Sequence, residues 1–299
     1  MTLPPDLMAR VRQIQIRTRR LVNDLLSGAY RSTFRGSGVE FEEVRPYQPG
    51  DDVRSIDWHR TARGGEAFIK TYVEERELTL QLLVDTSRSM DFGSQELTKR
   101  ESAAQLCALL AYVALRQQDR VGLSLFGAEP GLHLPPRKGA GSVSRVVREV
   151  IAAEPTGGGT DYHAVLEREL MTLRRRSLLF LVSDFIGAGD GPWADVLTSL
   201  TRRHEVIAVR VSDPLEEELP SAGRIVLEEL EGGRALELDT RSRKVREAWS
   251  EAARRRRAEL TAVLSRARVD LIELSTAASV ADPLVRFFKQ RRRRLGAAT

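Results

Sequence analysis

The stretch LLVDTSRSMDFGS, residues 82–94, contains the clearest indication of the fold. It continues the run LTLQLLV, residues 78–84, whose composition predicts a buried strand. The strand stops at a carboxylate, Asp85, and two hydroxyls follow at alternate positions, Ser87 and Ser89. Taken alone, these three polar residues indicate either an ordinary turn or one part of a site.

From residue 78 onward, strand patterns alternate with helix patterns. We predict strands at 78–84, 120–126, 131–136, 177–183, 205–211 and 269–275, a hairpin at 224–239, and helices at 101–117, 142–153, 161–174, 193–203, 241–267 and 283–292. Strands such as LLFLV, residues 178–182, are apolar throughout, as expected when helices cover both faces of a sheet. The alternation predicts an α/β fold with a doubly wound, mostly parallel sheet of the Rossmann type.

The first part of the chain has a different pattern. Residues 7–28 carry apolar side chains at helical spacing, and residues 29–78 contain glycines, prolines and short alternating runs typical of hairpins. We therefore expect an N-terminal helix and a β-hairpin extension over residues 1–75, packed on a main domain at 76–280. A basic C-terminal helix and tail follow at 281–299.

Composition restricts the class of protein. The chain has 299 residues, 41% of them hydrophobic and 30% charged, with a formal net charge of only +5, which does not by itself indicate nucleic acid. The single cysteine, Cys107, excludes an internal disulfide and fits a reducing compartment. No segment approaches the roughly 20 apolar residues that span a bilayer, and no secretory signal is visible. We expect a soluble, cytoplasmic protein.

Three polar clusters lie at the predicted carboxyl ends of strands or in loops on that side. The first contains Asp85, Ser87 and Ser89, the second is Thr160 in PTGGGTDYH, residues 155–163, and the third is Asp184 in VSDF, residues 182–185. In doubly wound sheets the ligand crevice lies at this end of the strands. Each cluster alone could cap a turn or a helix. Together they offer the oxygen ligands that hard divalent cations prefer, and the glycines at 157–159 allow a close approach.

This order of residues resembles the metal-ion-dependent adhesion site of von Willebrand factor type A domains. The pattern is D-x-S-x-S after an apolar strand, then a threonine in a glycine-rich loop, then an aspartate after a later strand. All five positions are matched, by Asp85, Ser87, Ser89, Thr160 and Asp184. The resemblance implies a von Willebrand factor type A-like domain with a bound Mg²⁺, or else Mn²⁺ or Ca²⁺. It also implies capture of an acidic partner side chain that completes the metal sphere.

A second resemblance covers residues 40–77, which are similar to the signature of the bacterial domain of unknown function 58 (DUF58) family. The matching residues are Arg45, Tyr47, Gly50, Asp51, Arg54, Ile56, Asp57, Trp58, Ala62 and Arg63. The family implies a chaperone-like partnership with a MoxR-type AAA+ ATPase. Some members carry membrane segments, whereas this sequence shows none.

The upstream block supports two interpretations that the sequence leaves open. Its charged residues can form a polar clasp of ion pairs, or they can present a docking surface to a partner. The candidate partner-binding residues are Arg45, Asp51, Arg54, Asp57, Trp58 and Arg63. We expect no catalytic residue there, because no nucleophile is paired with a base.

The sequence as a whole favours a metal-dependent protein-interaction module over an enzyme. We expect no small-molecule substrate; the partner is a MoxR-type ATPase, a client protein with an exposed Asp or Glu, or both. Nucleic acid is not expected, because the basic run at 254–257 has acidic neighbours at helical spacing and no aromatic residues interleave it. A metal-dependent hydrolase and a metal-independent scaffold remain as alternatives.

Overall fold

The computed structural model describes residues 39–49, 51–64, 66–74, 77–228 and 235–296. The chain separates into two compact units, a small one within Phe34–Leu78 and a main one that includes Thr79–Thr299. We refer to them as the hairpin unit and the main unit and describe each by itself. The amphipathic helix predicted at 7–28 lies outside the described residues.

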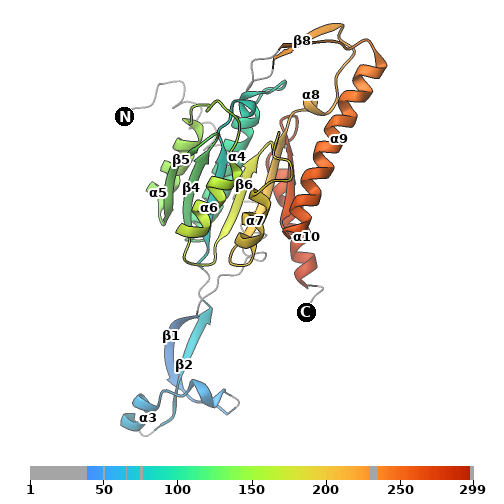
Figure 1. Ribbon diagram of the computed structural model, residues 1–299. Coiled ribbons are helices and arrows are strands. Elements are labelled where there is room, and N and C mark those ends of the chain that lie inside the picture. The colour runs from blue at the N-terminus through green and yellow to red at the C-terminus, as the bar shows by residue number, and fades with distance from the viewer. Residues whose placement is uncertain (1–38, 50, 65, 75–76, 229–234, 297–299) are drawn as a thin grey trace. The chain divides into compact units, whose positions relative to one another are not determined.

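The main unit is built on a six-stranded sheet with the strand order β10-β7-β6-β3-β4-β5 (Figure 1). The strands are β3 (Thr79–Asp85), β4 (Arg120–Phe126), β5 (Pro130–Arg137), β6 (Leu178–Ser183), β7 (Glu205–Ser212) and β10 (Asp270–Ser275). All neighbours pair in parallel except β5, which runs antiparallel to β4 at the edge. The predicted α/β fold with a doubly wound, mostly parallel sheet is therefore confirmed.

Helices cover both faces of this sheet. They are α4 (Lys99–Arg116), α5 (Ala140–Ile151), α6 (Tyr162–Thr172), α7 (Trp193–Thr201), α9 (Arg243–Arg266) and α10 (Ala281–Gly296). On one face α6, α7 and α9 pack in one apolar cluster with strand residues such as Leu83 and Leu181. On the other face α4 is buried along most of its length, as its nearly continuous apolar sequence predicts. Cys107 lies fully buried in α4, where burial raises the pKa of its thiol to about 12.

The first turn of α4 begins two residues before the predicted start. A capping box fixes this end: the Glu101 amide donates to the Thr98 hydroxyl at 3.1 Å, and the Glu101 carboxylate accepts from the Thr98 amide at 2.9 Å. As a result Lys99 belongs to the first turn of a buried helix.

The topological switch point of the sheet lies between β3 and β6. From β3 the chain continues to β4 on one side, and it later returns to β6 on the other side. The connections therefore leave the carboxyl ends of β3 and β6 in opposite directions, which is the arrangement that opens ligand sites in doubly wound sheets. Asp85 ends β3, and Asp184 directly follows β6.

Four smaller elements complete the described part of the main unit. The predicted hairpin is present as β8 (Arg224–Glu228) paired antiparallel with β9 (Ala235–Asp239). Two short helices were not expected, the 3-10 helix η3 (Arg88–Asp91) and α8 (Pro214–Glu217). Among the described residues, no helix combines the length and the apolar character needed to cross a bilayer.

The hairpin unit contains an antiparallel pair, β1 (Val39–Pro46) and β2 (Phe68–Glu74). Between the strands lie a 3-10 helix, η2 (Val53–Ser55), and a short helix, α3 (Trp58–Gly64). The hairpin agrees with the sequence pattern, whereas α3 was not expected, because a helix of two turns is too short to show a clear apolar periodicity.

Candidate metal centre

Asp85 lies at the centre of the candidate site and is fully buried. One carboxylate oxygen accepts from the Ser183 hydroxyl at 2.6 Å, and the other accepts from the Ser87 amide at 2.8 Å. The Thr160 hydroxyl lies 3.3 Å and 3.5 Å from the two oxygens. Thr160, from a loop 75 residues further along the chain, is thus brought against the end of β3 as the pattern predicts.

The two serines lie side by side where the chain turns into η3. The Ser87 and Ser89 hydroxyls share a hydrogen bond of 3.0 Å, with Ser87 buried and Ser89 half-buried. The turn after β3 therefore presents two neutral oxygens at alternate positions, next to the carboxylate.

Backbone hydrogen bonds hold the glycine-rich loop in place. The Thr156 amide donates to the Thr86 carbonyl at 2.8 Å, and the Asp161 amide donates to the Gly127 carbonyl at 2.7 Å. Gly158 and Gly159 take φ values of +94° and +87°, a region that favours glycine. The loop is thereby fastened to the ends of both β3 and β4, which sets the position of Thr160.

Asp184 is buried near Asp85 but has different partners. Its carboxylate accepts from the Lys99 ammonium at 2.6 Å and from the Ile186 amide at 3.0 Å. Burial and the nearby charge of Asp184 together raise the pKa of Asp85 to about 6. The structure thus brings Asp184 close enough to act on Asp85 electrostatically, without a direct hydrogen bond between the two carboxylates.

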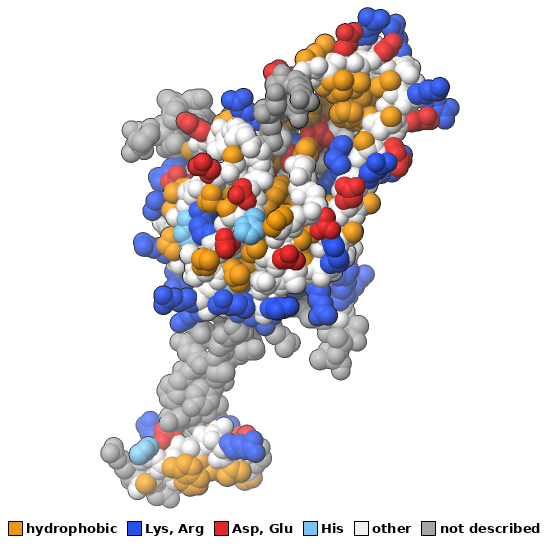
Figure 2. All heavy atoms as spheres, in the orientation of Figure 1, with side chains coloured by type: hydrophobic (Ala, Val, Ile, Leu, Met, Phe, Trp, Pro, Cys, Tyr) orange, Lys and Arg blue, Asp and Glu red, His pale blue; other side chains and the backbone are white. Residues whose placement is uncertain are grey.

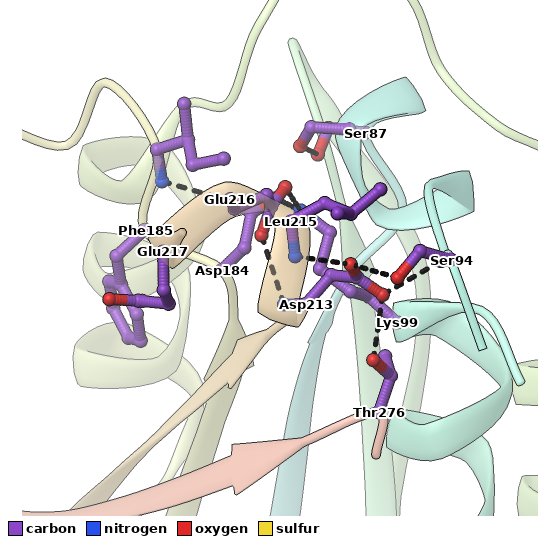
Figure 3. A network of polar contacts seen from close by, with 12 residues as sticks. Ser87, Ser94, Lys99, Asp184, Phe185, Asp213, Leu215, Glu216, Glu217 and Thr276 are labelled. Carbon is purple, nitrogen blue, oxygen red and sulfur yellow. Dashed lines mark hydrogen bonds and ion pairs between the residues drawn. The ribbon is translucent and has the colours of Figure 1, made fainter. Parts of the chain in front are cut away.

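Lys99 is the most unexpected residue of the site (Figure 3). It is completely buried, and its ammonium also donates to Glu216 of α8 at 2.5 Å. Burial alone would lower the pKa of Lys99, but the carboxylates of Asp184 and Glu216 outweigh it and raise the pKa. Nothing in the sequence indicated this contact, because Lys99 stands in a polar segment and Glu216 in a helix of four residues.

Ser183 and Tyr162 support the centre from the side of α6. The Tyr162 hydroxyl and the Ser183 hydroxyl share a hydrogen bond of 2.7 Å, and the Tyr162 ring stacks on Phe185 at 5.6 Å between centroids. Phe185 has a φ of +56°, a strained conformation for a non-glycine residue. These contacts orient the Ser183 hydroxyl toward Asp85; the sequence showed Ser183 beside Asp184 but not this role.

The chemistry of these residues fits a hard divalent cation. The site combines neutral hydroxyls with two carboxylates, the oxygen donors that Mg²⁺ prefers. Asp85 forms no ion pair within the described part of the chain, so its buried charge has no cationic partner there. In that same part, no three His, Cys, Asp or Glu side chains are arranged to hold a metal. A cation here would therefore rest largely on hydroxyl oxygens.

The candidate partner-binding residues all belong to the hairpin unit. Arg45 and Asp51 form a two-pronged ion pair at 2.9 Å and 2.8 Å, as a polar clasp requires. The hydrogen bond from Arg45 is the main reason why the pKa of Asp51 is lowered. Arg54 is exposed, Asp57 is half-buried, and Trp58 is 67% exposed rather than buried as an anchor.

Arg63 falls within α3, but its side chain lies outside the described residues.

The fold and the site together define an α/β protein with a polar centre at the switch point of a mostly parallel sheet. The family described as "Protein of unknown function DUF58" matches residues 43–259, and the chain belongs to this family. Uncharacterized proteins of Mycobacterium tuberculosis (Rv1480) and Mycobacterium bovis (Mb1516) are each 30% identical over 293 residues. Each alignment covers 97% of this chain and 91% of the relative.

Several solved structures have a similar fold. BatB from Bacteroides thetaiotaomicron aligns over 72% of this chain and 99% of its own, with 12% identity and a TM-score of 0.48. The SpRpn10 VWA domain aligns over 70% and 94%, with 12% identity and a TM-score of 0.37. Identities this low concern the fold alone and say nothing of what this chain binds.

The expected cytoplasmic localisation is corrected by these similarities. Two of the similar structures are described as an aerotolerance-related membrane protein from Bacteroides fragilis and a membrane spanning protein from Vibrio fischeri, with TM-scores of 0.47 and 0.25. The expectation rested on the single cysteine and on the lack of a visible secretory signal and of an apolar span in this sequence. These features describe the segments of one chain and do not identify the compartment in which the chain works.

Proposed function

We propose that this protein is a metal-dependent protein-interaction module rather than an enzyme. Asp85, Ser87, Ser89, Thr160 and Asp184 would hold a divalent cation, Mg²⁺ or else Mn²⁺ or Ca²⁺, at the ends of β3 and β6. The observation that supports this most directly is the buried Asp85 carboxylate, which lies 3.3 Å from the Thr160 hydroxyl and has no cationic partner among the described residues. A divalent cation would provide the missing charge.

The five residues would contribute two kinds of ligand to the cation. Ser87, Ser89 and Thr160 offer neutral oxygens, while Asp85 and Asp184 supply negative charge. When bound, the cation supplies a Lewis-acidic position for the carboxylate of a partner. The described hydroxyls of this centre bond to one another and to Asp85 rather than to a histidine or lysine, which favours ligation over activation of a serine or threonine nucleophile.

The partner that we propose is a MoxR-type AAA+ ATPase, a client with an exposed Asp or Glu, or both, acting in a chaperone-like system. The first choice is what the sequence resemblance implies for a member of the DUF58 family, to which the chain belongs. The exposed Trp58 supports a second contact through the hairpin unit, because large exposed aromatic side chains are frequent at protein interfaces.

The test compares two aspartates at constant Mg²⁺, because a chelator would also inactivate the ATPase. The full-length protein is immobilised and incubated with the MoxR-type ATPase from the same organism. Asp85→Asn should lose capture of the ATPase. Asp161→Asn is the matched control, since Asp161 is exposed, lies next to Thr160 and caps α6 through a bond at 3.0 Å that asparagine also makes. Equal capture by both variants would contradict the metal-bridged contact.

One observation favours a second candidate, a metal-independent scaffold. The Lys99 ammonium lies 2.6 Å from a carboxylate oxygen of Asp184, so the charge of Asp184 is neutralised without a metal. If the wild-type protein captures its partner but binds no Mg²⁺, the scaffold is the better description.

A further inference from the structure

A second polar site lies at the opposite end of the main unit, where β6, β7 and β10 begin. It is a cavity of about 540 Å³ whose walls carry five arginines, Arg176, Arg202, Arg266, Arg268 and Arg291. They come from the loop before β6 and from the ends or faces of α7, α9 and α10. Figure 2 shows Lys and Arg side chains gathered along this end of the main unit.

The cavity also has a buried donor without a partner. His204 lines it and is only 4% exposed, and neither of its ring nitrogens has a hydrogen-bond partner among the residues that the structure describes. Burial, reinforced by the charge of Arg203, lowers the pKa of His204, so the ring is neutral and offers one N–H. A buried polar group without a partner costs free energy, which a ligand in the cavity would recover.

The two acidic residues of the cavity cannot neutralise all five of its arginines. Arg266 pairs with Asp190 outside the lining, at 2.6 Å. Arg291 pairs with Asp270 at 2.7 Å and with Glu205, which accounts for both acids of the lining. Arg176, Arg202 and Arg268 form no ion pair or side-chain hydrogen bond with any described residue. A positive surplus therefore remains around the space.

Helix dipoles explain only part of this arrangement. Arg202 and Arg266 lie at the ends of α7 and α9, where a positive side chain stabilises a helix in any protein. Arg176 is in a loop, and the unpartnered ring of His204 gains nothing from a helix dipole. The planar guanidinium forks match the oxygens of a phosphate group, which accepts several charge-assisted hydrogen bonds at once.

We propose that this cavity binds a phosphate-bearing anion, held by the guanidinium groups of Arg176, Arg202 and Arg268 and by the His204 ring. The phosphate belongs either to a soluble polyphosphate or to the headgroup of an anionic lipid. Because the cavity lies at the amino ends of the parallel strands and the candidate metal centre at their carboxyl ends, the two sites are separate.

Arg268 offers a variant that removes the charge without harming the fold. It follows the end of α9 with a φ of +57°, in a Schellman motif in which the Val269 amide donates to the Leu264 carbonyl at 2.9 Å. Glycine is favoured in that conformation, so Arg268→Gly should raise the thermal unfolding midpoint slightly. With inorganic pyrophosphate as the probe, calorimetry should show one saturable site that Arg268→Gly weakens roughly tenfold.

The chain contains a matched control for this variant. Gln118 follows the end of α4 with a φ of +60° in the same motif, with the Asp119 amide donating to the Ala114 carbonyl at 2.9 Å. Gln118→Gly should raise the unfolding midpoint in the same way and leave pyrophosphate affinity unchanged. Arg137→Gln controls for the loss of one charge at an exposed position that does not line the cavity.

Vesicle sedimentation distinguishes the two sources of phosphate. Vesicles of phosphatidylcholine with phosphatidylglycerol, but not of phosphatidylcholine alone, should bind the protein if a lipid headgroup is the ligand. That binding should fall with Arg268→Gly and not with Arg137→Gln. The proposal is overturned if neither pyrophosphate nor the anionic vesicles bind, or if Arg268→Gly binds both probes as tightly as the wild type.

Discussion

Lys99 shows how strongly one residue can shape this site. Desolvating an ammonium costs several kcal/mol, so a completely buried lysine is rare unless carboxylates surround it. Here Asp184 and Glu216 lie 2.6 Å and 2.5 Å from its nitrogen. Lys99 therefore neutralises the part of the centre that the proposed cation would share through Asp184.

Replacing Lys99 with methionine should distinguish the effect of the Lys99 ammonium from that of the proposed cation. Lys99→Met leaves buried carboxylates without their partner, so we expect unfolding free energy to fall by about 3–5 kcal/mol. Mg²⁺ should then raise the unfolding midpoint more in Lys99→Met than in the wild type, because more negative charge is left to neutralise. Thermal unfolding with and without Mg²⁺ measures both effects. An identical Mg²⁺ response in the two proteins would show that Lys99 and the cation do not share Asp184.

Asp213 predicts a pH dependence of stability. It is fully buried and accepts from the Ser94 hydroxyl at 2.6 Å, the Thr276 hydroxyl at 2.7 Å and the amides of Ser94 and Leu215 (Figure 3). Burial alone would raise the pKa of Asp213, but these hydrogen bonds outweigh it and lower the pKa. Asp213 therefore contributes stability that is present above its ordinary pKa and is lost as the pH falls through the folded-state pKa.

Removing one of these donors should act mainly at neutral pH. Thr276→Val should lower the unfolding free energy by about 1–3 kcal/mol at pH 7, because a buried carboxylate loses a hydrogen bond. Losing the Thr276 hydrogen bond should raise the pKa of Asp213 in the variant relative to the wild type. The loss of unfolding free energy should therefore shrink as the pH falls through the pKa of Asp213 in the variant. Urea unfolding at neutral and acidic pH measures this difference. A penalty that is independent of pH would mean that Thr276 acts through packing and not through the charge of Asp213.

At the scale of elements, the glycine-rich loop depends on the end of β4. A Cβ on Gly127 would lie 1.8 Å from the Thr156 hydroxyl, and Thr156 fastens the loop to β3. Gly127→Ala should displace the loop, cost about 1–3 kcal/mol and weaken the Mg²⁺-induced rise in the unfolding midpoint.

A second glycine provides the control. Gly141 lies in α5, and a Cβ there meets nothing within 4 Å. Gly141→Ala should leave the Mg²⁺ response intact and raise the unfolding free energy by about 0.5–1 kcal/mol, since alanine favours the helix. If both variants respond to Mg²⁺ as the wild type does, the position of Thr160 does not govern the centre.

The sequence predicts the long elements well because each buries a periodic apolar face. The strands at β3 and β6 and the helix α4 are examples, and with them comes the meeting of Asp85, Ser87 and Thr160. Short elements such as α8 could not be predicted, because four residues are too few to show an apolar periodicity. The contact between Lys99 and Glu216 could not be predicted either, because the two residues are 117 positions apart and their contact depends on where α8 lies.

At the scale of the whole molecule, the main unit has two polar sites at opposite ends of one sheet. Perturbations of well-separated sites usually add independently. We therefore expect Arg268→Gly to weaken pyrophosphate binding and leave the Mg²⁺ response unchanged. Ser89→Ala should weaken the Mg²⁺ response and leave pyrophosphate affinity unchanged. The double variant should show the weaker pyrophosphate binding and the weaker Mg²⁺ response together. Thermal unfolding and calorimetry on the three proteins check this. A deficit of the double variant beyond the sum of the single ones would indicate that the two ends communicate.

The central claim is that the polar centre at the ends of β3 and β6 holds a divalent cation. Its most direct test is a calorimetric titration of the chelator-treated, full-length protein with Mg²⁺, comparing the wild type with Asp85→Asn and Asp161→Asn. We predict one saturable site in the wild type and in Asp161→Asn, and no binding in Asp85→Asn. Absence of binding in the wild type, or undiminished binding in Asp85→Asn, would contradict the claim.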